Sequence, residues 1–113
     1  MKRVKESGVR ERNFAWDLAF ASDEVIEGIA RMCGKEAYPY TQEETNGETL
    51  FHVTLADGSA TLRVRPQEAR HVPFNPILKF QRTFLTVSMP EAGPQTVETF
   101  RRKLTLTFLR AGG

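Results

Sequence analysis

Cysteine and histidine are scarce in this chain, and their scarcity excludes several kinds of site. Cys33 is the only cysteine, and His52 and His71 are the only histidines, among 113 residues. One cysteine cannot form an intramolecular disulfide, which favours a reducing compartment. Zinc is usually held by three or four Cys and His ligands at short spacings. We therefore expect no metal site, and we expect the chain to lie in the cytoplasm.

Long apolar runs and phosphate-binding loops are also missing. No stretch of 18 apolar residues occurs, so no transmembrane helix is expected. The charged start at residues 1–6 is not followed by an apolar stretch and is not a secretory signal. The glycines before the final pair are isolated, without the spacing of a Walker or Rossmann loop. These absences predict no membrane association and no cofactor.

The remaining composition is typical of one soluble globular domain. Hydrophobic residues make up 40% of the chain and charged residues 27%, which separates it from disordered sequences. The length suffices for a core without disulfide or metal staples. Residues 1–12 are rich in charge and poor in large apolar side chains. We therefore expect a flexible segment over residues 1–12 and a single domain over residues 13–113.

Alternation predicts a first strand over residues 13–21. Phe14 and Trp16 lie on one side of it, and Ala15 and Ala19 lie on the other. The small side chains of Ala15 and Ala19 predict that a helix packs over them.

An apolar stripe at three- and four-residue spacing predicts that helix over residues 23–33. Ser22 is the expected N-cap and Gly34 the expected C-cap glycine. Gly28, inside the helix, would let it lie close to the sheet.

Alternating runs at residues 48–56 and 59–65 are joined by Asp57-Gly58, which predicts a β-hairpin. The preceding residues 38–47 are expected to be irregular and to end in a turn.

The second half of the chain is less regular. Three prolines predict a loop over residues 66–76, and residues 77–89 form a long β run. The alternation of this run changes phase near Gln81 and Arg82, which predicts a bulge there. Residues 103–110 alternate and favour a strand. Residues 95–102 fit either the other strand of a hairpin or a helix, and we favour the hairpin.

These elements predict an α+β fold in the order β-α-β-β-β-β. One main helix, over residues 23–33, would pack on a mainly antiparallel, twisted sheet of about five strands. Eight Phe and one Trp are more aromatic bulk than one such helix covers. This packing argument predicts either a homodimer that associates through the sheet or a sheet curled around its own core.

Charge is distributed unequally along the chain. Residues 1–56 carry seven Lys/Arg and ten Asp/Glu, whereas residues 57–113 carry nine Lys/Arg and four Asp/Glu. A basic sheet face in the second half would contact the phosphates of single-stranded nucleic acid or RNA, with Phe80 and Phe84 for stacking. The alternative is that the two halves complement each other within the fold, or that the chain self-associates. The residues expected on the ligand-binding face are Arg63, Arg65, Lys79, Arg82, Arg101 and Lys103.

Candidate catalytic residues are few. Asp17 is the one acid among apolar strand residues, which fits a general acid or base but is more typical of a structural ion pair. Cys33 lies on the apolar stripe of the predicted helix and is expected in the core. No nucleophile accompanies either histidine in the sequence. We therefore expect a binding domain for a protein or nucleic-acid partner, not an enzyme.

The chain ends in Gly112-Gly113. This ending resembles the tails of ubiquitin-like modifiers and sulfur-carrier proteins, in which an adenylating enzyme activates the terminal carboxylate. The resemblance covers residues 108–113 and implies Gly113 as the reactive residue and Gly112 as the residue that gives access. The predicted order, with one strand before the helix, differs from the hairpin-then-helix order of the β-grasp fold.

Overall fold

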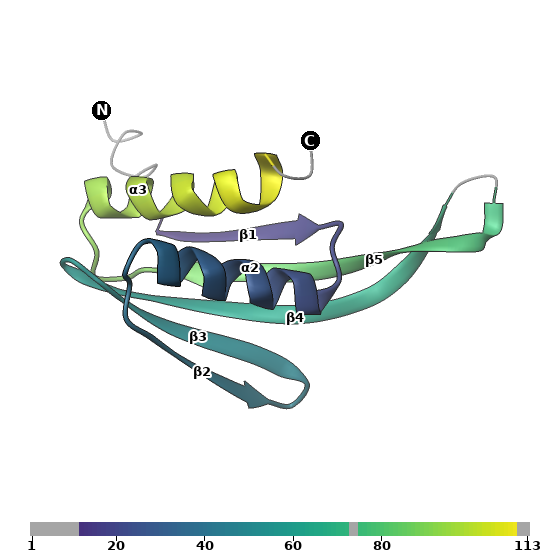
Figure 1. The fold of residues 1–113 in the computed structure, drawn as a ribbon, viewed down its shortest axis with the longest axis horizontal. Coiled ribbons are helices and arrows are strands. Elements are labelled where there is room, and N and C mark those ends of the chain that lie inside the picture. The colour runs from purple at the N-terminus through teal and green to yellow at the C-terminus, as the bar shows by residue number, and fades with distance from the viewer. Residues whose placement is uncertain (1–11, 73–74, 111–113) are drawn as a thin grey trace.

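Two helices cover one face of a five-stranded antiparallel sheet (Figure 1). The computed structural model describes residues 12–72 and 75–110. The strands lie side by side in the order β1-β5-β4-β3-β2, and every pair of neighbours is antiparallel. The elements are β1 Asn13–Leu18, α2 Ser22–Lys35, β2 Tyr40–Thr45, β3 Glu48–Leu55, β4 Gly58–Val72, β5 Asn75–Ser88, α3 Pro94–Thr105 and a π-helical turn, η1, Leu106–Arg110.

The α+β class, the antiparallel sheet and the helix at residues 23–33 are confirmed, but several elements differ from the prediction, including the hairpin favoured over residues 95–102, which belong to α3. The expected irregular stretch contains β2, whose six residues are all exposed and offer no apolar pattern. The expected strand over residues 103–110 is wrong. It is helical, because α3 buries Val97, Phe100 and Leu104 at three- and four-residue spacing while Leu106 is 50% exposed.

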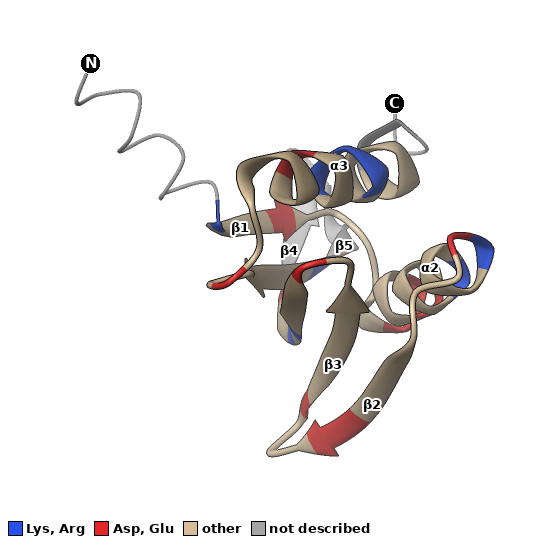
Figure 2. Cartoon of the chain, turned by 90° about the vertical axis from the view of Figure 1, so that its left-hand side faces the viewer, with Lys and Arg blue, Asp and Glu red and all other residues tan. Residues whose placement is uncertain are grey.

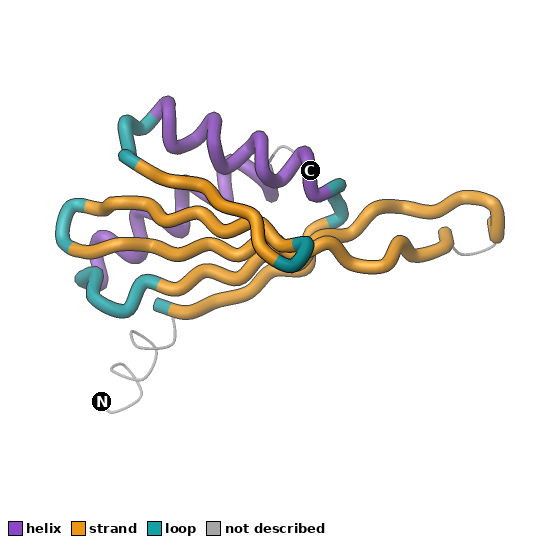
Figure 3. Tube along the Cα trace, turned by 90° about the horizontal axis from the view of Figure 1, so that it is seen from below, coloured by secondary structure: helices purple, strands orange, loops and turns teal. Residues whose placement is uncertain are grey.

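The expected loop over residues 66–76 is wrong for most of its length. β4 and β5 continue as a long hairpin that projects beyond the helices (Figure 3). Pairing of β4 with β3 ends at Val64, so Pro66 loses no hydrogen bond on that side. The bulge predicted within residues 77–89 is wrong. Gln67 pairs with Arg82 but Arg70 pairs with Phe80, so the extra residue lies on β4 instead.

The helices pack on the face of the sheet that carries the large apolar side chains. Leu18, Phe51 and Leu85 are buried there, whereas Ala15 is exposed on the opposite face. The prediction that the helix covers Ala15 and Ala19 is therefore wrong. The packing argument for a homodimer loses its premise, because it counted one helix and α3 is a second, whose Val97, Phe100 and Leu104 are buried in the same core.

The ends of α2 differ from the expected caps. Ala21 is the N-cap, and its backbone N–H donates to the Glu24 carboxylate at 3.0 Å. Ser22 is the first helical residue, and its hydroxyl lies 3.3 Å from the Thr83 hydroxyl. At the other end the helix runs past Gly34, and Ala37 takes the left-handed conformation with φ of 61°.

Gly28 does allow a close approach, but to the C-terminal helical segment instead of the sheet. A Cβ atom at Gly28 would lie 2.7 Å from Cε1 of Phe108, which is buried. The contact brings α2 and η1 together over the sheet and leaves no room for a larger residue.

Replacing Gly28 by alanine should lower the free energy of unfolding by about 1–3 kcal/mol, because the added methyl group overlaps the Phe108 ring. This loss should outweigh the ~1 kcal/mol gain in helix propensity. Gly34→Ala is the matched control in the same helix, because its new methyl group would have no neighbouring side chain within 4 Å. Urea unfolding should show Gly34→Ala at least as stable as the wild type. A Gly28→Ala variant that is also stabilised would contradict the tight contact.

Candidate binding face of the sheet

The face of the sheet opposite the helices carries no buried side chain among the described residues. Strand register arranges its side chains in rows that cross the sheet from β1 to β2. We call this surface the open face. It comprises Asn13, Ala15 and Asp17 of β1, Arg82, Phe84, Thr86 and Ser88 of β5, Ser59, Thr61, Arg63 and Arg65 of β4, Glu48, Leu50, His52 and Thr54 of β3, and Thr41 and Glu43 of β2.

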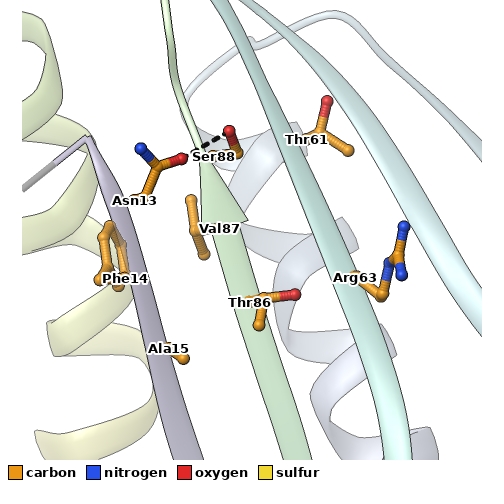
Figure 4. Close-up of a pocket in the computed structure, with 8 residues that line it drawn as sticks. All are labelled: Asn13, Phe14, Ala15, Thr61, Arg63, Thr86, Val87 and Ser88. Carbon is orange, nitrogen blue, oxygen red and sulfur yellow. Dashed lines mark hydrogen bonds between the residues drawn. The ribbon is translucent and has the colours of Figure 1, made fainter. Parts of the chain in front are cut away.

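Small side chains leave a hollow of about 430 Å³ on the open face, over β1, β5 and β4 (Figure 4). Ala15, Thr61 and Thr86 lie in it, and Arg63 stands at its rim. The Ser88 hydroxyl donates to the Asn13 side-chain oxygen at 2.8 Å. The hollow therefore offers hydroxyl and amide groups with one guanidinium group beside them.

The arginines of the open face are paired with carboxylates of the same face. Glu48 lies 3.5 Å from Nε of Arg63 and 3.8 Å from Nε of Arg65. Arg82 pairs with Asp17. Exposed pairs of this kind add little stability, about 0–1 kcal/mol each. Their consequence is electrostatic, because each guanidinium group has a neighbouring negative charge.

An aromatic ring and a histidine complete the charge pattern. The Arg65 guanidinium lies over the Phe84 ring, 5.4 Å from its centroid. His52 Nε2 lies 3.0 Å from a Glu43 carboxylate oxygen on β2, and both side chains are exposed. The open face is therefore a mosaic of both signs, not a basic surface.

The structure brings together only part of the predicted basic face. Arg63, Arg65 and Arg82 lie on the open face, and the backbone of Lys79 lies further along β5, opposite His71. The expected positions of Arg101 and Lys103 on an adjacent strand are wrong.

Arg101 and Lys103 belong to α3, on the other side of the sheet, because residues 94–105 are helical. Arg101 lies over the Phe14 ring, 5.0 Å from its centroid. Lys103 Nζ donates to Glu36 at 2.5 Å and lies over the Tyr38 ring. Both cations have structural partners at these positions.

Sequence reasoning missed the polar residues of the hollow. Asn13, Thr86 and Ser88 were not singled out, nor was Glu48, the carboxylate between two arginines. A signal for Thr86 and Ser88 was present, because they alternate with the buried Leu85, Val87 and Met89.

The candidate catalytic residues have structural roles. Asp17 forms the ion pair that was the alternative to catalysis, and neither Asp17 nor His52 lines the hollow on the open face. Cys33 is fully buried in the core, as predicted. Among residues 12–68 and 81–108, whose side chains the structure describes, no three His, Cys, Asp or Glu side chains gather as metal ligands. Gly112 and Gly113 lie outside the described residues.

Comparison with known protein families finds no matching family, and comparison with curated proteins finds no match. In the part of the chain that the structure describes, no helix has the length and apolar character needed to cross a membrane.

Burial raises the pKa of the Cys33 thiol to about 11, from an ordinary value of 9.0. The unfolded chain then loses this proton more readily than the native one. We expect the free energy of unfolding to be unaffected by this group below about pH 9 and to fall between about pH 9 and 11. Urea unfolding across this range should show a smaller fall for Cys33→Ala than for the wild type. Rapid labelling of the native thiol at pH 8 would contradict this burial.

The paired arginines predict weak binding of polyanions. A fluorescent single-stranded oligonucleotide should show little anisotropy change with the wild type at about 0.15 M salt, the physiological range. Glu48→Gln, which leaves Arg63 and Arg65 without their carboxylate, should bind more tightly at low salt. Thr54→Gln, on the same face and without a charge change, is the control. Micromolar wild-type binding that weakens steeply with salt would instead favour a nucleic-acid partner.

Proposed function

We propose that this chain is a non-catalytic protein-interaction domain that self-associates through the open face of its sheet. The observation that carries the proposal is the charge mosaic of that face. A polyanion would compete with Glu48 and Asp17 for the arginines it needs. A surface that carries both signs meets no net repulsion from a second copy of itself.

Two-fold symmetry makes such a mosaic self-complementary. In a symmetric dimer, Arg65 of one copy can pair with Glu48 of the other while the reciprocal pair forms across the axis. The described side chains of the open face include three arginines and no lysine, together with Phe84 and Leu50. Arginine and aromatic residues are enriched in protein interfaces, whereas lysine is depleted.

The size of the face sets the expected strength of association. Five strands about 4.8 Å apart, with about eight residues each rising about 3.3 Å, give roughly 600 Å². Specific interfaces of standard size bury about 800 Å² per partner. We therefore expect a reversible dimer that forms at micromolar or higher concentration.

Nucleic-acid binding is the alternative function for the same face. It has less support, because the basic residues expected on one face are separated. Arg101 and Lys103 lie on the helical side, away from Arg63 and Arg65. The location proposed from the sequence, the cytoplasm, is supported by a free and buried Cys33.

Ala15→Arg should shift the chain towards the monomer, because its side chain would fill the hollow and add an unpaired charge. Gln95→Arg is the matched control, with the same new charge at an exposed site on α3. Sedimentation velocity across concentrations up to about 100 µM should show a dimer for the wild type and Gln95→Arg. Thermal unfolding should give both variants the same Tm within a few degrees.

Two results would contradict the proposal. The first is a wild type that remains monomeric at every concentration. The second is a dimer that Ala15→Arg leaves intact, since that dimer would use another surface.

A further inference from the structure

A second hollow, of about 320 Å³, lies on the helical side, between α2 and the end of α3. Its apolar part is formed by Met32 and Leu106, beside Gly28. Leu106 is 50% exposed. Among the described residues, Leu106 and Tyr40 are the only large hydrophobic side chains that are exposed. A half-exposed leucine that lines a hollow is available to an apolar ligand group.

Cations surround this apolar patch. Arg31 and Lys35 lie one helical turn apart on α2, and Lys103 lines the hollow from α3. Figure 2 shows basic positions on both helices. Glu36 is the one carboxylate among the described lining residues, and it already accepts a hydrogen bond from Lys103. Within the described residues, no carboxylate lies within 4 Å of Arg31 or Lys35.

The helix alone does not account for this arrangement. Cations near a helix C-terminus are favoured by the helix dipole, which explains a basic last turn of α2. Two like charges at i and i+4 nevertheless repel each other. An anion placed between Arg31 and Lys35 would remove this repulsion, and the dipole gives no reason for the exposed leucine beside them.

We propose that the groove between α2 and α3 binds a small amphiphilic anion. Its anionic head lies between Arg31 and Lys35, and its short apolar tail covers Met32 and Leu106. The volume is close to the lower limit of small-molecule sites, about 300 Å³. The groove is on the opposite side of the sheet from the open face, so this proposal is independent of self-association.

The test is a titration of the full chain with octanoate and with octyl phosphate, followed by the backbone amide NMR signals. We expect saturable chemical-shift changes at the amides of Gly28, Met32 and Leu106. The anion that binds more tightly shows whether the groove prefers a carboxylate or a phosphate head group. The double variant Arg31→Gln/Lys35→Gln should bind at least about fivefold more weakly. Arg101→Gln/Arg102→Gln is the matched control, because it removes the same charge from α3 outside the groove and should bind as the wild type does.

The tail and the head are tested separately. Leu106→Ser should weaken octanoate binding, and 1-octanol, which keeps the tail without the charge, should bind more weakly than octanoate. Equal shifts with octanol would overturn the anionic head, and equal affinity for acetate would overturn the apolar tail. The proposal would be overturned if neither anion gives saturable shifts in the wild type at concentrations up to about 10 mM. Binding weaker than this would not indicate a specific site.

Discussion

The contact between Gly28 of α2 and the Phe108 ring is the constraint on which the arrangement of the helices depends. Without a side chain at position 28, α2 and the end of α3 approach closely enough to share one face of the sheet. α2 lies against β4 and β5, and α3 lies beside β1, where Arg101 covers Phe14. Together they bury apolar side chains from every strand except β2. The opposite face is thereby left mainly to small, polar and charged residues, with Phe84 and Leu50 among them.

That division of the two faces determines what the open face can bind. Its arginines are close to carboxylates that come from different strands, Glu48 from β3 and Asp17 from β1. The resulting potential is short-ranged, since neighbouring opposite charges cancel beyond a few ångströms in water. Such a face discriminates by the positions of its charges and by the shape of its hollow. In the proposed self-association, a second copy with matching positions would satisfy both, whereas a polyanion would compete with Glu48 and Asp17 for the arginines.

Local patterns predicted the elements whose side chains are divided cleanly between core and solvent. The helix at residues 23–33 and the hairpin around Asp57-Gly58 have such patterns. β2 has none, because it pairs with β3 at the sheet edge and buries no side chain. Residues 103–108 alternate in a way that also fits a strand. Only the burial of both Leu104 and Phe108 on one side of a helix distinguishes the helix from the strand. The error placed Arg101 and Lys103 on the wrong side of the sheet. The pairing of Glu48 with two arginines of β4 depends on register, which single-strand patterns do not contain.

The groove and the open face are separated by the thickness of the sheet, yet they depend on the same helices. α2 supplies Arg31 and Lys35 to the groove and also covers the inner side of β4, whose outer side carries Arg63 and Arg65. A ligand in the groove would contact α2 and α3 at once and would favour their closed packing at Gly28 and Phe108. It would stabilise the native chain without touching the open face. A single exposed substitution can alter either surface without changing the other, so the two proposed binding events can be tested independently. Any coupling between them would have to pass through the packed core.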